Sequence, residues 1–204
     1  MTRQISDRKR GWRLLVQFRK DRDGAAAIEF ALLSIPFLML VFATFETFIA
    51  FAGEQLMSNA VETMARKIRT GEITFAQGKS TDKTEAEFRA MFCDEIAVLN
   101  MCSSTEANTP EKLYVDVRQF ASFADMPRDI PKISSEEYSD LDTSEFAFSP
   151  GGADSNNMVR AYYRWQIMTD LVRPYITNIR PPGKLIPTDF LIVSTAAFQN
   201  EKYN

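Results

Sequence analysis

The sequence predicts an α+β protein in which a long N-terminal transmembrane and amphipathic helix precedes a small periplasmic domain with a second helix and an antiparallel sheet. Three observations predict this class: a long apolar segment, an apolar pattern of helical period that continues beyond it, and three later segments with strand character. We expect a basic cytoplasmic leader over residues 1–24, a transmembrane helix over 25–52, and the domain over 53–204, with the helix continuing to about residue 70.

The apolar segment predicts insertion into a membrane. Residues 30–45 carry no charge, and the wider stretch 25–52 contains only two, Glu29 and Glu46. As a helix this stretch spans about 42 Å, which is enough to cross a hydrocarbon core of about 30 Å with both carboxylates near the interfaces. A buried helix in a soluble core is the alternative, but it would leave the basic leader unexplained.

The charges on the two sides of this segment predict its orientation. Residues 1–24 hold eight basic and three acidic side chains, a net of +5, whereas residues 53–204 hold 16 basic and 22 acidic ones, a net of −6. Positively charged flanks stay in the cytoplasm, so we expect the domain on the opposite side.

The overall composition excludes several function classes. The chain has no His, only two Cys and a net charge of −3. It therefore lacks the commonest general base, cannot assemble an ordinary Cys/His zinc site and shows no basic footprint for nucleic acid. We expect no enzyme activity, no cofactor and no metal site.

The two carboxylates of the apolar segment call for different explanations. Glu46 can extend outward at the far interface as a tolerated boundary charge. Glu29 is either a carboxylate interacting with the dipole at the start of the helix or a functional group.

Residues 22–30, Arg-Asp-Gly-Ala-Ala-Ala-Ile-Glu-Phe, lead into an apolar helix that contains Pro36 and resemble the N-terminus of TadE-like proteins, the minor pseudopilins of the Flp/Tad branch of type IV pili. The resemblance implies that a prepilin peptidase of the bacterial inner membrane cuts after Gly24, which makes Ala25 the mature N-terminus. It also implies that Glu29 and Phe30 replace the Glu-Tyr pair of the major pilins. The implied partners are other pilins or pseudopilins, the Tad secretion machinery and the inner membrane, with no nucleic acid.

The end of the chain carries a weaker resemblance. Residues 159–165 are similar to a late Tyr-x-Trp strand of the family, and residues 196–201 are similar to its closing Asn-Glu-Pro sequence, with Lys202 in place of the proline. The family further implies that Glu29 pairs with the N-terminal amine of a neighbouring subunit in an apolar bundle. Such a pair favours registered assembly over a free monomer because both groups are desolvated.

Two other functions stay open. Ala50-Phe51-Ala52 has the pattern of a signal peptidase site, and a cut there would release a soluble chain that begins at Gly53. Such a chain, or an uncleaved single-pass protein, would be a binding module that recognises an envelope partner through the acidic stretch 125–145. A membrane-bound hydrolase that uses only Asp and Glu is a third class, although no carboxylate pair is singled out by its context.

The remaining signals concern the domain. A helix is expected at about 82–100, where Thr84 and Glu87 fit a capping box. Cys93 lies on this helix and Cys102 follows it, so in an oxidising periplasm they should form a disulfide, with two free buried thiols as the alternative.

Strands are expected over 113–120, 158–168 and 190–198, and a proline-rich excursion over 171–187. The acidic stretch 125–145 reads as a solvated loop. Three of its side chains have a spacing distantly similar to that of calcium ligands, but the glycine of an EF-hand loop is missing: Asp140, Asp142 and Glu145.

Overall fold

The structure, a computed structural model, describes residues 22–203, so most of the predicted leader 1–24 lies outside the described residues. The chain divides into two units, Met1–Phe45 and Glu46–Asn204. The boundary falls within the first described helix, a few residues before the predicted limit of the membrane segment at residue 52.

Helix α2 runs over Arg22–Arg69. Alanine and leucine favour it in its N-terminal part, and it continues through Pro36 although that residue has no backbone N–H to donate. In the first unit its large apolar side chains are exposed, from Ile28 to Phe45. Ala26–Arg69 is the one described helix that is long and apolar enough to cross a membrane, which makes it compatible with a single-pass anchor.

In the second unit the same helix is amphipathic, as its apolar spacing predicts. One stripe is buried at intervals of three or four residues: Met57, Ala60, Val61, Met64, Ala65 and Ile68. The helix ends at Arg69, and Gly71 then turns the chain with φ +78°. A Cβ at Gly71 would lie 2.7 Å from the ring of Tyr203, so both the backbone conformation and the close approach require glycine here.

The second helix is shorter than predicted. Helix α3 covers Glu85–Glu95, and a 3₁₀ turn, η1, follows at Ala97–Leu99. The capping box between Thr84 and Glu87 is confirmed, with the Thr84 side chain accepting from the Glu87 N–H. Asn100 ends the turn in the left-handed conformation, with φ 50°.

The sheet has four strands in the order β2-β1-β3-β4. The three long strands pair antiparallel and correspond to the predicted ones: β1 at Leu113–Phe120, β3 at Asn156–Gln166 and β4 at Asp189–Gln199. The predicted antiparallel sheet is confirmed for these three strands, and a fourth strand that the sequence did not indicate, β2 at Phe148–Ser149, pairs parallel with β1 and makes the sheet mixed. Two residues are too few to show a period in the sequence.

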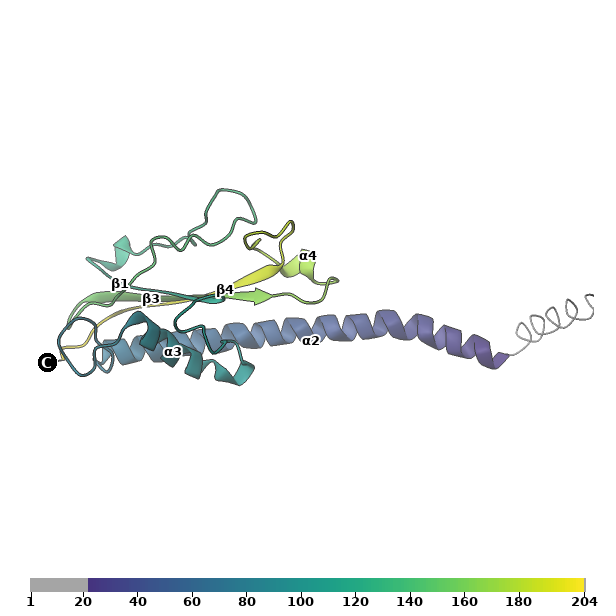
Figure 1. Cartoon of the computed structure of the whole chain (residues 1–204), viewed down its shortest axis with the longest axis horizontal. Coiled ribbons are helices and arrows are strands. Elements are labelled where there is room, and N and C mark those ends of the chain that lie inside the picture. Colours follow the sequence, from purple (N-terminus) through teal and green to yellow (C-terminus); the bar gives the residue numbers. More distant parts are fainter. Residues whose placement is uncertain (1–21, 204) are drawn as a thin grey trace, which may run out of the picture. The chain divides into compact units, whose positions relative to one another are not determined.

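The sheet lies between a helical layer and a layer of long connections (Figure 1). One face packs on α3 and on the second-unit part of α2, and this interface forms the main core. The opposite face is covered by a smaller cluster with Tyr162, Leu141 and Ile179 at its centre. Two connections supply this cover: residues 121–147, which include the 3₁₀ turn η2 (Phe123–Asp125), and residues 167–188, which include the short helix α4 (Arg173–Ile176).

Candidate functional site

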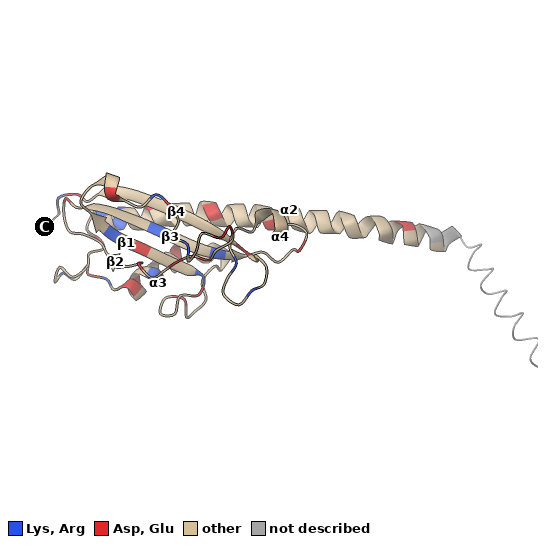
Figure 2. Ribbon diagram, turned by 90° about the horizontal axis from the view of Figure 1, so that it is seen from above, with Lys and Arg blue, Asp and Glu red and all other residues tan. Residues whose placement is uncertain are grey.

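The motif of the predicted site lies at the start of α2. Gly24 is exposed, with no atom within 4 Å of the position a Cβ would take, and the Gly24–Ala25 peptide bond lies inside the helix. Phe30 is 74% exposed. The Glu29 carboxylate is also exposed, and no hydrogen bond or ion pair joins it to any side chain that the structure describes. Figure 2 shows that the apolar part of α2 which follows carries almost no charge.

This arrangement limits what Glu29 can do. An ionised carboxylate on an apolar helix is costly in a low-dielectric surrounding unless an opposite charge or donors meet it. Its own subunit supplies neither within the described residues. The Glu29 carboxylate therefore needs a cation or hydrogen-bond donors that the described residues do not supply.

Glu46 has a role that the sequence did not reveal. Its two carboxylate oxygens accept hydrogen bonds from the backbone N–H groups of Met168, at 2.5 Å, and Thr169, at 2.9 Å. The expectation of an outward boundary charge missed these contacts because the partners lie more than 120 residues further along the chain. Glu46 thus fixes the start of the 167–188 connection against α2.

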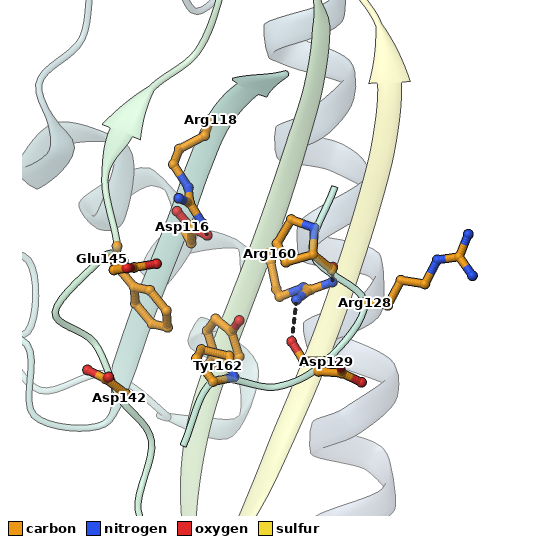
Figure 3. Close-up of a pocket in the computed structure, with 11 residues that line it drawn as sticks. Asp116, Arg118, Arg128, Asp129, Asp142, Glu145, Arg160 and Tyr162 are labelled. Carbon is orange, nitrogen blue, oxygen red and sulfur yellow. Dashed lines mark hydrogen bonds and ion pairs between the residues drawn. The ribbon is translucent and has the colours of Figure 1, made fainter. Parts of the chain in front are cut away.

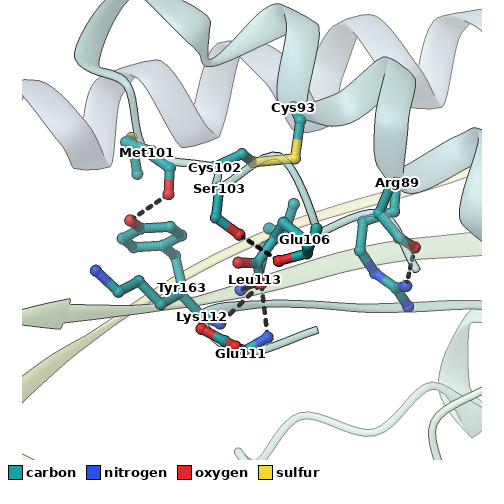
Figure 4. The surroundings of a disulfide bond; sticks show 12 residues. Arg89, Cys93, Met101, Cys102, Ser103, Glu106, Glu111, Lys112, Leu113 and Tyr163 are labelled. Atoms are coloured by element: carbon teal, nitrogen blue, oxygen red, sulfur yellow. Dashed lines mark hydrogen bonds between the residues drawn. A yellow bond between two sulfur atoms is a disulfide. The ribbon is translucent and has the colours of Figure 1, made fainter. Parts of the chain in front are cut away.

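Cys93 and Cys102 form a disulfide, with their Cα atoms 5.7 Å apart (Figure 4). Both residues are half-buried against the main core. The disulfide joins the last turn of α3 to the chain just after η1. It thereby constrains the connection between α3 and the sheet, which has little regular structure of its own.

A buried carboxylate anchors the chain just after the disulfide. Glu106 is 1% exposed, and its Oε1 accepts from the backbone N–H groups of Glu111, Lys112 and Leu113, each at 2.8 Å (Figure 4). These donors lie at the entry to β1. No sequence pattern indicates this role, because glutamate side chains are usually solvated.

Tyr163 ties the same region to the sheet. Its hydroxyl donates to the carbonyl oxygen of Met101 at 2.7 Å. Burial, and to a lesser degree the negative charge of Glu106, raises the pKa of Tyr163 to about 12. The neutral phenol is the form that the folded state stabilises.

We expect removal of the disulfide to destabilise the second unit. Replacing both Cys93 and Cys102 with serine should lower the free energy of unfolding by about 2–3 kcal/mol, because the unfolded chain regains the entropy of a short closed loop. Denaturant titration followed by circular dichroism measures this. Reductant should destabilise the wild-type protein by a similar amount and leave the double variant unchanged. If the wild-type protein without reductant and the double variant were equally stable, the prediction would be contradicted.

Tyr163 should make the protein sensitive to alkali. Since its pKa rises from about 10 in the unfolded chain to about 12 in the fold, its contribution is complete below pH 10 and is lost as the pH rises toward 12, by about 2–3 kcal/mol. Tyr163→Phe should flatten this part of the stability profile, at a cost of about 1 kcal/mol at neutral pH for the lost hydrogen bond. Tyr175→Phe, at a side chain that is 85% exposed, is the control and should keep the wild-type slope.

A cavity of about 260 Å³, lined mostly by charged residues, lies between the sheet and the 121–147 connection (Figure 3). Asp116 and Arg118 form an ion pair across 2.7 Å on its floor. The Arg160 guanidinium donates to the backbone carbonyl oxygens of Pro127 and Asp129 and so holds the connection on the sheet. Tyr162 is fully buried with no hydrogen-bond partner for its hydroxyl among the described residues, and burial raises its pKa.

The structure does not bring together the three acidic side chains whose spacing is distantly similar to that of calcium ligands. Asp140 pairs instead with Arg164 at 2.9 Å, whereas Asp142 and Glu145 line the cavity. Hydrogen bonds from Ser144 lower the pKa of Asp142. Within residues 22–203 no group of three or more His, Cys, Asp or Glu side chains is placed to hold a metal ion. The acidic stretch is also less solvated than expected, because Ser139, Asp140 and Leu141 are buried.

Comparison with known proteins supports the resemblance seen at the N-terminus. The sequence model of the family described as TadE-like protein matches residues 24–66, about a fifth of the chain. The match begins at Gly24 and includes Glu29, Phe30 and the apolar segment. No curated protein and no solved structure matches the chain. The matched segment links the protein to Tad pilus systems. The TadE-like family is a pilus-associated family and not an enzyme family.

Proposed function

We propose that this protein is a membrane-anchored minor pseudopilin that takes part in assembly of a Flp/Tad-type pilus. The observation that carries the proposal is the segment Gly24–Phe30. It is matched by the TadE-like family and places a carboxylate with no partner among the described residues on an exposed apolar helix. The helix is the inner-membrane anchor, the leader is cytoplasmic and the domain is periplasmic.

Processing by a prepilin peptidase is the first step of the proposed pathway. Hydrolysis of the Gly24–Ala25 bond by water leaves a carboxylate on Gly24 and a free amine on Ala25, which protonates. The leader takes its net charge of +5 with it. Gly24 favours the cut because glycine is a poor helix former, so this turn of α2 opens into a protease at lower cost than its alanine-rich neighbours.

The new ammonium supplies the cation that Glu29 needs. In a bundle of neighbouring subunits the amine of one Ala25 meets the Glu29 carboxylate of the next, and their attraction offsets the cost of desolvating both groups. The exposed apolar side chains of α2 form the surroundings of this pair, first in lipid and then in the bundle.

The mature N-terminus tests this proposal most directly. Intact-mass measurement with peptide sequencing of the protein from its native membrane should give a chain that begins at Ala25. A matched Gly24→Val variant, which replaces an exposed residue with open space around it, should keep its fold and retain the leader. A wild-type chain that begins at Met1 or Thr2 would contradict processing.

The same measurement separates the secreted binding module. That alternative requires a start at Gly53, after Ala50-Phe51-Ala52. Gly53 is buried within α2, and a Cβ there would lie 3.1 Å from the Trp165 ring, so close packing already accounts for this glycine. A start at Gly53 would overturn the pseudopilin proposal in favour of the secreted form.

A further inference from the structure

We propose that residues 167–188, the connection between β3 and β4, form a docking loop that rests on the surface of the lipid bilayer. The inference depends on the membrane anchorage in the proposed function, but it assigns a separate contact to the domain itself. The bilayer surface would thus meet the protein at two places, the helix and this loop.

The docking loop exposes more apolar surface than a solvated connection needs. Five large apolar side chains lie open on it, with exposed fractions from 45% to 95%: Met168, Leu171, Tyr175, Leu185 and Ile186. Clusters of this kind mark interaction surfaces on soluble domains. The loop also carries Lys184, together with Arg173 and Arg180, which pair with Asp170 and Glu136. Apolar side chains, a tyrosine and basic groups together are the composition of protein surfaces at membrane interfaces.

The position of the loop identifies lipid as the occupant. The Glu46 carboxylate binds the backbone of Met168 and Thr169, which holds the loop beside the turn of α2 where the apolar segment ends. Phe48, Ile49 and Phe51 on that turn are themselves 45–67% exposed. An open groove of about 350 Å³ continues this surface toward Tyr175 and Phe190.

The hydrogen bonds of Glu46 explain how its carboxylate is accommodated near the end of the apolar segment. Backbone N–H groups near the hydrocarbon need acceptors, because water is scarce there. The two oxygens of Glu46 satisfy two such groups of the loop, and these in turn stabilise the charge. The same two bonds bring the exposed apolar side chains to the level of the interface.

The sheet register provides a control surface far from the loop. The loop follows the end of the sheet where Gln166 pairs with Asp189, whereas Phe123 lies just beyond the opposite end, where Phe120 pairs with Asn156. Along the eleven residues of β3 these ends are about 35 Å apart. Phe123 is 52% exposed, so it is an exposed large apolar side chain like those of the docking loop but lies at the other end of the sheet.

The experiment uses the full chain in vesicles of phosphatidylethanolamine and phosphatidylglycerol with brominated acyl chains. Since the two native cysteines form a disulfide, one introduced cysteine carries an environment-sensitive fluorophore at each of three sites. The variants are Leu185→Cys on the loop, Leu38→Cys in the apolar segment and Phe123→Cys as control. Bromine should quench about half of the emission at 185 and at 38, and almost none at 123, because only the first two sites reach acyl chains.

Two exposed substitutions show whether apolar contact holds the loop. Adding Tyr175→Asp and Ile186→Asp should abolish quenching at 185 and leave quenching at 38 unchanged, since both side chains are more than half exposed and neither residue is bound by Glu46. If bromine did not quench the label at 38 in a chain with no other substitution, both the anchor and the docking loop would be overturned.

The remaining outcomes separate docking from the anchor. Quenching at 38 but not at 185, with the label at 185 in a watery environment, would overturn docking and leave the anchor intact. A label at 185 that reports an apolar environment but is not quenched would mean that protein, such as a second copy of the chain, covers the loop instead of lipid.

Discussion

Replacing Glu29 with Gln is expected to abolish incorporation into the pilus while the chain still inserts in the membrane. Glutamine has nearly the same shape but no charge, so it cannot pair with the Ala25 ammonium of a neighbouring subunit. An unpaired buried charge costs about 3–5 kcal/mol, which corresponds to a loss of at least a hundredfold in assembled protein. Sheared pilus fractions and washed membranes, quantified with the same antibody, measure the two populations.

Matched variants make the result specific to residue 29. Glu62→Gln removes an exposed carboxylate from the same helix and should assemble normally. Glu29→Asp keeps the charge on a shorter side chain and should recover part of the assembly. Wild-type assembly by Glu29→Gln would rule out the ion pair as its driving force. A variant that disappears from both fractions would instead indicate a defect in folding or insertion.

The features that the sequence predicted are those written in contiguous residues. The apolar run 25–52 and the stripe from Met57 to Ile68 determine α2, and Thr84 with Glu87 determines the start of α3. The motif around Gly24 and Glu29 is likewise a continuous string, which is why the family comparison and the resemblance agree over it. Local pattern is sufficient where the physical cause is itself local.

The features that the sequence missed depend on partners far along the chain. Glu46 contacts Met168 only in the folded chain, and Asp140 of the acidic stretch pairs with Arg164 on β3. Strand β2 exists because Phe148 reaches the edge of β1, not because two residues favour a strand. Such contacts follow from the topology of the sheet, and no spacing within the sequence records them.

Glu106→Ala should produce a large loss of stability in the domain, about 3–5 kcal/mol. Three backbone N–H groups at the entry to β1 would lose their common acceptor. The bond from Leu113 is buried and those from Glu111 and Lys112 are partly buried, and an unsatisfied buried donor costs about 1–3 kcal/mol. Denaturant titration of the full chain in detergent, followed by circular dichroism, measures the change.

The conservative variant distinguishes the acceptor from the charge. Glu106→Gln keeps an amide oxygen that can accept the same three bonds, so its loss should be smaller, about 1–2 kcal/mol. It also removes the anion that helps to raise the pKa of Tyr163. The pKa of Tyr163 should then fall below about 12, although burial still raises it, and the alkaline loss of stability should begin at a lower pH. If Glu106→Ala cost less than about 1 kcal/mol, water would be replacing the carboxylate, and the disulfide and Tyr163 would by themselves hold this segment on the sheet.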